Sequence, residues 1–589
     1  MSMSSAPQHP IKIMHRWCVA VATVLLLSAC AQLPKNVERP VSAALASTTG
    51  SALAILVQQR HDAASARFDS GFVLLDGPQA AYGSRLALVE SAQKTLDLQY
   101  YAIHADASTG RLLAGVRDAA ARGVRVRILI DDFHSTGRDA LVLGLAFEKN
   151  IEMRMFNPLA GDRASSLSRI ANSLGEASRV QQRMHNKLFL ADNVMGVAGG
   201  RNLGDAYFGN STIGNFVDLD VLAAGPIVRD LSRSFDIYWN NERSYPVETL
   251  VTQEALTRIR DRAREADTGK TSGVRDPSRT DDGPKPAEDE PLPEDTNPTP
   301  EQRAHAWDQK AIDLGKAAFV WAPAVVLADQ PGKIEPDNSS PNAGDGRAPA
   351  MVISKQSDKQ NRPANQSLDV AADLAAGSET VVEGLLQLIG QSRRDLLITS
   401  PYFVPGDDMK QVFAAARARG VRVRVLTNSL ASNDAPVAHV GYARHREEML
   451  AMGVELYELR SGRADFGSAF GASGASVTGA SKAMLHSKVL VLDSRLLVVG
   501  SMNLDLRSQL QNTEVALLIR SDELSRIATA QIEAALREGA WHVELADGKL
   551  IWRAPKGSGL QDTTTEPDAS ASLRFLLKLF GPLAPDKLL

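Results

Sequence analysis

The chain has 589 residues and a formal net charge of −4 at neutral pH, with 44% hydrophobic and 23% charged residues. This length exceeds what one ordinary hydrophobic core holds, so two domains joined by linkers are expected. The weakly acidic balance creates no general positive field, and we expect no nucleic-acid partner. Both cysteines, Cys18 and Cys30, lie near the N-terminus, which excludes a cysteine-based zinc site or a disulfide framework from the rest of the chain.

Residues 1–29 are predicted to be a lipoprotein signal peptide. A positively charged segment ending at Arg16 precedes an apolar run of 13 residues, which is short of the roughly 20 needed to span a bilayer. The run ends in Leu27-Ser28-Ala29-Cys30, which resembles the bacterial lipobox and implies that Cys30 carries lipid. Because Ala31 and no aspartate follows, Gram-negative sorting implies an anchor in the outer membrane, facing the periplasm. An ordinary secretory signal or a short uncleaved anchor is the alternative.

After a tether with a helix, residues 30–71, the first folded lobe is predicted to span residues 72–265. Its pattern alternates between helical spacing and strand-like runs, with short connections. Strand, helix and strand in this order form a βαβ unit, which favours a largely parallel sheet. The expected elements are a helix at 84–94, a strand at 96–101, a helix at 111–122 that ends before Gly123, and a strand at 124–130.

The same passage occurs again near the end of the chain. Residues 121–127, Ala-Arg-Gly-Val-Arg-Val-Arg, are repeated residue for residue at 418–424, and a strand-like run at 396–400 precedes the second copy. A repeat of this extent predicts a duplicated domain, with the second lobe at 376–560. The alternating arginines of both copies are expected on an exposed sheet face.

The lobes are joined by residues 266–375, which we expect to be mostly disordered. Their acidic and polar composition buries too little apolar surface to offset the entropy of ordering. An apolar segment near 315–333 interrupts this linker and is expected to dock on one lobe as a strand. On composition, a solvated linker is favoured over a partner-binding segment. Residues 561–589 form a C-terminal tail that contains an amphipathic segment.

One pattern occurs once in each lobe: His-x-Lys-x4-Asp, followed by small residues and an asparagine. Three fixed positions are a weak filter, but two copies with matching downstream spacing in a repeated lobe are a strong one. We therefore predict a single active site built from two halves. The first half comprises His185, Lys187, Asp192, Gly199, Gly200 and Asn202, and the second comprises His486, Lys488, Asp493, Gly500, Ser501 and Asn503.

The expected local structure places each histidine and lysine on one side of a strand. If residues 184–190 form a strand, the alternation of side chains directs His185 and Lys187 to the same face, and the same holds for residues 485–492. The small residues that follow are expected to leave room for a substrate. Asp192 and Asp493 lie at predicted turns, so a structural role for them is as open as a catalytic one.

These residue types suit a phosphodiester substrate. One imidazole can attack phosphorus to form a covalent intermediate, and a second can protonate the leaving oxygen and then deprotonate the acceptor. Lysines and asparagines can hold the non-bridging oxygens, so neither a metal nor a cofactor is required. A carboxylate beside each imidazole would fix its tautomer, and we expect Asp218 to serve His185 and Glu514 to serve His486.

On these motifs the chain resembles the phospholipase D superfamily, and within it the C-type bacterial cardiolipin synthases. The stretches that carry the closer resemblance are 199–208, 400–406 and 441–444. The resemblance implies an α/β fold of two αβα-sandwich lobes related by a pseudo-two-fold axis, each with a mixed sheet. It also implies phosphatidyl transfer between phospholipids through a phosphohistidine, with His185 as the nucleophile. Phospholipid hydrolysis on the same site and a non-catalytic lipid- or partner-binding lipoprotein remain the alternatives.

Overall fold

The computed structural model describes residues 33–161, 163, 177–272, 297–334, 351–353, 375, 377–461, 482–571 and 573–575. The predicted signal peptide and Cys30 lie outside these ranges, as do parts of the linker and of the C-terminal tail. Within the described ranges, no helix combines the length and the apolar character needed to cross a membrane.

The first lobe is built on a nine-stranded mixed sheet. Its neighbouring strands β2, β3 and β4 run parallel, whereas the other adjacent pairs are antiparallel. In order across the sheet, the strands are β10 (Val320–Trp321), β1 (Gly71–Leu75), β8 (Asp220–Ala224), β6 (Met195–Ala198), β5 (Leu188–Ala191), β2 (Thr95–Tyr100), β3 (Arg125–Asp131), β4 (Ile151–Phe156) and β9 (Ser244–Pro246).

The second lobe repeats this arrangement in a ten-stranded sheet, where β13, β15 and β16 are the parallel strands. Apart from the added outer strand β23, each of its strands has a counterpart at the same place in the first sheet. In order, the strands are β12 (Met351–Ile353), β11 (Ala324–Asp329), β21 (Val515–Arg520), β19 (Leu496–Gly500), β18 (Val489–Leu492), β13 (Asp395–Thr399), β15 (Arg422–Asn428), β16 (Glu455–Leu459), β22 (Ala540–Ala546) and β23 (Lys549–Arg553).

This duplication confirms the predicted two-lobe α/β fold with mixed sheets. The prediction that the sheets are largely parallel is wrong, because βαβ connections account for only three adjacent strands of each sheet. The remaining pairs are antiparallel: they include the β5–β6 and β18–β19 hairpins, strands that the linker supplies, and strands far apart in the sequence such as β1 and β8.

The apolar linker segment supplies one strand to each sheet, where docking on one lobe was expected. β10 pairs with β1 of the first lobe, and β11 pairs with β21 of the second. β11 holds the place in the second sheet that β1 holds in the first, so this lobe takes a strand from before residue 376. The linker also contains α9 (Pro300–Asp308), which begins with a capping box between Thr299 and Gln302.

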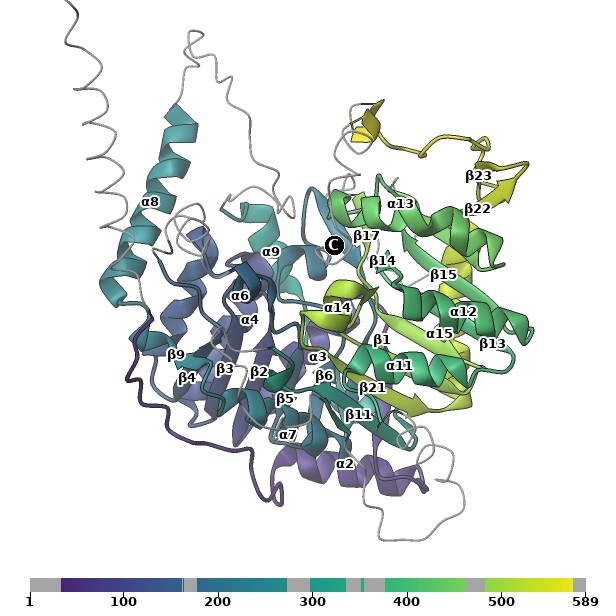
Figure 1. Cartoon of the computed structure of the whole chain (residues 1–589). Helices are drawn as coiled ribbons and strands as arrows, with labels where there is room; N and C mark the ends of the chain where they lie inside the picture. Colours follow the sequence, from purple (N-terminus) through teal and green to yellow (C-terminus); the bar gives the residue numbers. More distant parts are fainter. Residues whose placement is uncertain are drawn as a thin grey trace, which may run out of the picture.

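Helices cover both faces of each sheet (Figure 1). One continuous core, with members such as Leu231 and Ile532, packs α7 and α15 together with residues of both sheets and so joins the lobes. The helices are α3 (Pro78–Ser91) and α4 (Ala107–Ala121) on the outer face of the first sheet, α7 (Ile227–Trp239) and α15 (Asp522–Ala534) in the shared core, and α11 (Val381–Gly390), α12 (Asp407–Ala418) and α13 (Pro436–Ala451) on the second sheet.

The repeated arginines depart from the expected exposed sheet face. Arg127 is fully buried, with its guanidinium 2.7 Å from Asp97 and 2.8 Å from Asp236. Its counterpart Arg424 is also buried, 2.9 Å from Asp395. Of the four, only Arg422 is exposed, and Arg125 is half-buried. A buried guanidinium is tolerated when carboxylates neutralise it, and the sequence repeat does not reveal those partners.

Candidate active site

Each His–Lys pair lies just before its chain segment enters the sheet of its own lobe, at a point where the chain contacts the other lobe. β5 begins at Leu188 and β18 at Val489, so both His–Lys pairs precede the strand that was expected to carry them. The backbone N–H of His185 donates to Thr513 of the second lobe at 2.9 Å. The N–H of His486 donates to Val217 of the first lobe, also at 2.9 Å. The strands therefore break because these backbone groups bond across the lobe interface.

The two orienting carboxylates are exchanged between the lobes. Nδ1 of His185 lies 3.0 Å from Glu514, and Nδ1 of His486 lies 2.8 Å from Asp218. Both carboxylates had been predicted, but each was assigned to the histidine of its own lobe, and that pairing is wrong. A carboxylate accepts a hydrogen bond at Nδ1 only from the Nδ1–H tautomer, so Nε2 of each neutral imidazole is the unprotonated nitrogen.

The lysines are held beside their histidines. Lys187 donates to the carbonyl oxygen of His185, and Lys488 to that of His486, each at 2.7 Å. Both side chains are buried, so their charges act in a medium of low polarity. The paired lysines and histidines place two ammonium groups beside two imidazoles, which suits an anionic substrate.

Burial lowers the pKa of both imidazoles. For His185 the value falls to about 4, because the Glu514 carboxylate offsets only part of the burial penalty. The pKa of His486 falls well below its ordinary value, since Lys488 and Lys187 add their repulsion to the effect of burial. Burial acts to raise the pKa of Glu514, but His185, Lys187 and Ser501 together lower it to about 2. At neutral pH this pair therefore consists of an ionised carboxylate and a neutral imidazole.

The small residues after each motif make room for these carboxylates, where room for the substrate was expected. A Cβ on Gly200 would lie 2.8 Å from both carboxylate oxygens of Asp218. At the equivalent position, the Ser501 hydroxyl donates to Glu514. A Cβ on Gly199 would collide with Asp220, and one on Gly500 with the neighbouring strand β21. These positions are therefore constrained by the packing of β6 and β19 against their neighbours.

The two asparagines differ in their surroundings. Asn202 accepts a hydrogen bond from the N–H of Ala102 at 3.2 Å and donates to the Tyr207 hydroxyl at 3.1 Å. Oδ1 of Asn503 is buried and has no hydrogen-bond partner among the described residues. The ring of Tyr207 lies edge-on to His486 at 5.3 Å, and that of Tyr101 edge-on to His185 at 5.1 Å, so aromatic side chains flank both imidazoles.

Asp192 and Asp493 lie at the ends of β5 and β18 away from the histidines, in tight turns with φ of 51° and 54°. The Asp192 carboxylate accepts hydrogen bonds from the backbone N–H groups of residues 93–95. Asp493 does the same for residues 393–395. This placement contradicts their inclusion in the catalytic set. Each aspartate instead fixes the turn of a hairpin to the start of the adjacent strand, which is β2 in the first lobe and β13 in the second.

Sequence reasoning missed a buried ion pair beneath Glu514. Asp329, at the end of β11, accepts hydrogen bonds from Nζ of Lys333 at 2.7 Å and from the N–H of Glu514 at 3.0 Å. Lys333 also donates to the carbonyl of Ser508, whose hydroxyl donates to Glu514 at 2.9 Å. In the first lobe the buried pair is different: Arg85 contacts Asp220 at 2.9 Å. Neither pair follows from the repeat, since Ala516 occupies the position equivalent to Asp220.

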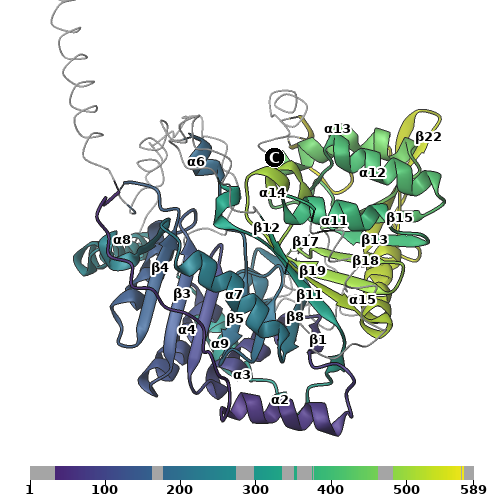
Figure 2. The same ribbon diagram turned by 60° about the horizontal axis from the view of Figure 1, so that its bottom comes forward.

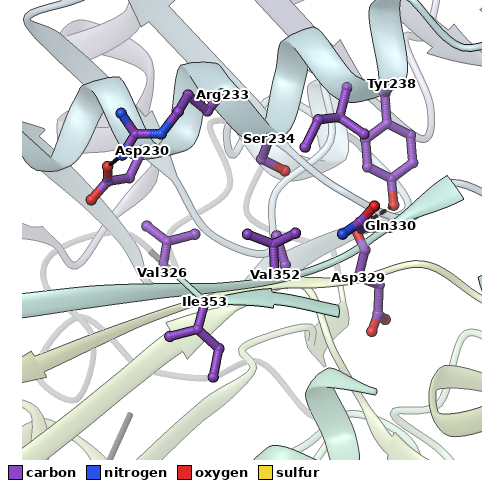
Figure 3. Close-up of a pocket in the computed structure, with 11 residues that line it drawn as sticks. Asp230, Arg233, Ser234, Tyr238, Val326, Asp329, Gln330, Val352 and Ile353 are labelled. Carbon is purple, nitrogen blue, oxygen red and sulfur yellow. Dashed lines mark hydrogen bonds and ion pairs between the residues drawn. The ribbon is translucent and has the colours of Figure 1, made fainter. Parts of the chain in front are cut away.

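A pocket of about 220 Å³ lies behind this ion pair, between α7 and the β11–β12 edge, and its lining includes neither histidine. The Tyr238 hydroxyl donates to the carbonyl oxygen of Asp329 at 2.8 Å from the pocket side, while the Asp329 side chain extends to the other side of its strand (Figure 3). Asp329 thus connects the interface between the lobes to the backbone of Glu514. Among the described residues, no group of three or more His, Cys, Asp or Glu side chains is arranged to hold a metal ion.

Comparisons with known proteins agree with this geometry. A family model described as "Cardiolipin synthase, PLD-like domain" matches residues 86–239 and 385–536. Cardiolipin synthase C of Escherichia coli (strain K12) is 32% identical over 82% of this chain and 88% of its own length. An uncharacterized protein of Helicobacter pylori (strain ATCC 700392 / 26695) is 30% identical over 88% of this chain and 89% of its own.

Among solved structures, phosphatidylserine synthase from Haemophilus influenzae Rd KW20 has a TM-score of 0.51 and 13% identity, covering 90% of this chain and 98% of that one. At this identity the likeness shows the fold. The family match covers a segment of each lobe, and each segment contains one histidine motif. The chain therefore belongs to the family of cardiolipin synthases with phospholipase D-like domains.

Proposed function

We propose that this protein transfers a phosphatidyl group between phospholipids, through a phosphohistidine, to give cardiolipin-like products. The observation that carries the proposal is the pair of buried imidazoles, each held at Nδ1 by a carboxylate of the opposite lobe and accompanied by a buried lysine. This arrangement is complete only when both lobes contribute. It supplies a nucleophile, an acid–base group and positive charge for the phosphoryl oxygens.

The first step forms the covalent intermediate. Nε2 of His185 attacks phosphorus while the bond between phosphorus and the leaving-group oxygen breaks. The ionised Glu514 carboxylate stabilises the positive charge that develops on the attacking imidazole. His486 donates its Nε2 proton to the leaving alcohol, and Lys187 and Lys488 stabilise the charge on the non-bridging oxygens.

The second step reverses these roles. His486 accepts a proton from the hydroxyl group of the acceptor lipid, whose oxygen attacks phosphorus as the bond to His185 breaks. Transfer to water instead of a lipid alcohol would release phosphatidic acid by the same steps. The chemistry of the site is common to transfer and hydrolysis, so access of the acceptor decides between them.

The protonation of His486 depends on the substrate. Repulsion from Lys488 and Lys187 contributes to the low pKa of His486 in the empty site. A bound phosphodiester places a negative charge beside the same lysines and offsets their repulsion, which raises the pKa of His486. Binding of the substrate thus favours the proton that the first step consumes.

The protein is also proposed to be a lipoprotein, with lipid on Cys30 holding it to the periplasmic face of the outer membrane. The support is the lipobox-like Leu27-Ser28-Ala29-Cys30 with Ala31 after it. Several acyl chains on one anchor suit stable membrane attachment. Incorporation of labelled palmitate into the wild type and its loss in Cys30→Ser test this part of the proposal.

The activity is tested with the purified protein in detergent micelles that contain labelled phosphatidylglycerol and phosphatidylethanolamine. Formation of cardiolipin is the expected result. Release of phosphatidic acid without cardiolipin would replace transfer by hydrolysis. Lipid binding without any turnover would instead identify a non-catalytic lipoprotein and overturn the proposal.

A further inference from the structure

Residues 39–49 form an extended strap that crosses the first lobe. Its backbone is held by long polar side chains from the sheet and from α7. Arg127 donates to the carbonyl of Ser42 at 3.1 Å, and the N–H of Ala44 donates to Asp236 of α7 at 2.8 Å. Because Arg127 is itself fully buried, the strap is an integral part of the folded lobe. Figure 2 shows this purple segment rising from α2 (Ala52–Ala63) along the lobe.

The C-terminal end of the strap lies at the edge of the sheet opposite the active site. Lys94, just before β2, donates to the carbonyl of Thr49, and Asn193, in the β5–β6 turn, donates to that of Leu45, each at 2.8 Å. Both contacts lie at the end of the strands where Asp192 binds its turn. This end of the strap is therefore far from the histidines along the strand direction.

Toward the N-terminus the strap climbs to the edge of the sheet that carries the site. Its partners advance from Arg125 at the start of β3 to Arg154 near the end of β4, which donate to the carbonyls of Ala43 and Pro40. Arg39 then donates to the carbonyl of Ser244 at 3.2 Å and lies over the Tyr245 ring at 4.3 Å. Ser244 pairs with Phe156, the last residue of β4.

The point of exit lies on the same edge of the sheet as His185. Asp131 ends β3 and accepts the N–H of Met184, the residue before His185. Ser244 of β9 lies two strands from β3 and four from β5, the strand that His185 precedes, which corresponds to about 20 Å across the sheet at the usual strand spacing. The chain that precedes Arg39 therefore leaves the lobe on the edge of the sheet that carries His185, to one side of the active site.

The connection to the proposed lipid is short. Nine residue steps separate Cys30 from Arg39. A fully extended chain covers at most about 3.3–3.6 Å per residue, so lipid on Cys30 lies within roughly 30 Å of the strap's end. Two elements that adjoin the site also carry exposed apolar side chains. Ile213, just before β7 (Gly214–Val217), is exposed by 55%, and Leu510, in α14 (Leu506–Leu510), by 48%.

We infer that the strap is an orienting tether, which turns the active-site edge toward the bilayer that holds the anchor, so that the enzyme acts on phospholipids of that same bilayer. The inference rests on the proposed function and on the proposed lipid at Cys30. Exit of a short tether from the edge that carries the histidines keeps this edge of the protein near the lipid surface. A tether that left the lobe at the Thr49 end would instead hold the opposite edge of the sheet near the lipid surface.

The test compares two inserts of the same flexible Gly-Ser sequence, about 24 residues long. One is placed between Lys35 and Asn36, both exposed, and lengthens the tether ahead of the strap. The matched control is placed between Ala46 and Ser47, also exposed, and leaves the tether length unchanged. Each lipidated protein is reconstituted in phosphatidylglycerol vesicles, with labelled lipid either in those vesicles or in separate protein-free vesicles.

The wild type is expected to turn over lipid of its own vesicles and little of the separate ones. Effective concentration falls roughly as the −3/2 power of tether length, so the first insert should lower turnover in the protein's own vesicles about sevenfold. The control insert should leave it unchanged within about twofold, and all three proteins should have equal activity in detergent micelles.

Equal turnover of the two vesicle populations by the wild type would overturn the inference, as would equal losses from both inserts. Inactivity of the wild type in micelles would overturn the proposed function itself. Failure of the wild-type protein to float with the vesicles would show that no anchor is present, which removes the tether and with it the inference.

Discussion

Both halves of the site contain an imidazole, a carboxylate and a lysine, but different side chains hold these groups in place. In both, an imidazole is bound at Nδ1 by a carboxylate of the other lobe, and a lysine donates to the carbonyl of its own histidine. Glu514 is bound by the hydroxyls of Ser501 and Ser508. Asp218 has Gly200 at the position of Ser501. The duplicated lobe thus retains the imidazole, the lysine and the orienting carboxylate, while the polar groups behind them have diverged.

This difference shifts the pKa values of the two carboxylates in opposite directions. Burial raises the pKa of Asp218, and Arg201 and Lys488 offset part of that effect. Glu514 has its pKa lowered to about 2, because the nearby positive and hydroxyl groups outweigh burial. A firmly ionised carboxylate suits the imidazole that becomes cationic during attack, which is His185 in the proposed mechanism. Near-identical motifs can therefore take different roles when their surroundings differ.

Removing either imidazole has the largest expected effect. We expect His185→Ala and His486→Ala each to lower cardiolipin formation by roughly 10³-fold or more, since the two groups act as a unit. A donor lipid with a nitrophenol leaving group needs no acid. With it, His486→Ala should still form a phosphohistidine that acid-free mass spectrometry detects, and His185→Ala should not. The reverse result would exchange the two roles, and substantial turnover in either variant would contradict a shared site.

The orienting carboxylates come next. Glu514→Gln and Asp218→Asn should each lower kcat by roughly 10²–10⁴-fold with little change in KM, because the imidazole loses its fixed tautomer. The nitrophenol donor should restore much of the first-step rate to Asp218→Asn, which impairs the acid, and little to Glu514→Gln. Rescue of both variants to the same extent would remove the proposed difference between the halves.

The Asp329–Lys333 pair tests whether support behind Glu514 matters. Lys333→Met leaves Asp329 buried without its ammonium partner, so we expect a loss of about 3–5 kcal/mol in unfolding free energy and a lower kcat. The double variant Asp329→Asn with Lys333→Met should recover most of that stability. Lys410→Met, which removes an ion pair with Glu448 on the outer helices, is the control. An unchanged kcat in a folded Lys333→Met protein would show that Glu514 needs no such support.

The pH dependence of stability should reflect the buried imidazoles. The pKa of His185 is about 4 in the folded protein and about 6.5 when unfolded, so between these values the unfolded state binds more protons. Stability should therefore fall as pH drops from 6.5 toward 4. Urea unfolding of the wild type and His185→Gln at pH 7 and pH 5 measures this, and the variant should lose less stability. An equal loss in both would exclude His185 as a source.

The turn aspartates should have the smallest effect on activity. In Asp192→Asn and Asp493→Asn, an amide oxygen replaces a charged carboxylate that binds three successive backbone N–H groups. We expect a loss of about 1–3 kcal/mol in unfolding free energy, with kcat within a few-fold of the wild type. A fall in kcat comparable to that of Glu514→Gln, in protein that remains folded, would return these residues to the catalytic set.

Several features of the fold depend on contacts that the linear pattern does not encode. Arg127 belongs to an alternating run that would suit an exposed strand, yet Asp97 and Asp236 neutralise it in the core. The segment 324–329 is an apolar run inside a polar linker, which identifies a strand but not its place. Its place is decided by β21 of the second lobe, which pairs with it in the folded protein.

The sequence by itself determined the duplication, the α/β class and the two His-x-Lys motifs, because spacing and periodicity are local and occur twice. It also identified Asp218 and Glu514 as the carboxylates. Only the tertiary structure decided that each serves the other lobe's histidine, since that pairing depends on how the two lobes face each other. The same holds for Asp329 beneath Glu514 and for the strap, whose partners lie far away along the chain. Local chemistry can be read from adjacent residues, whereas the assembly of a site across two lobes is set by their packing.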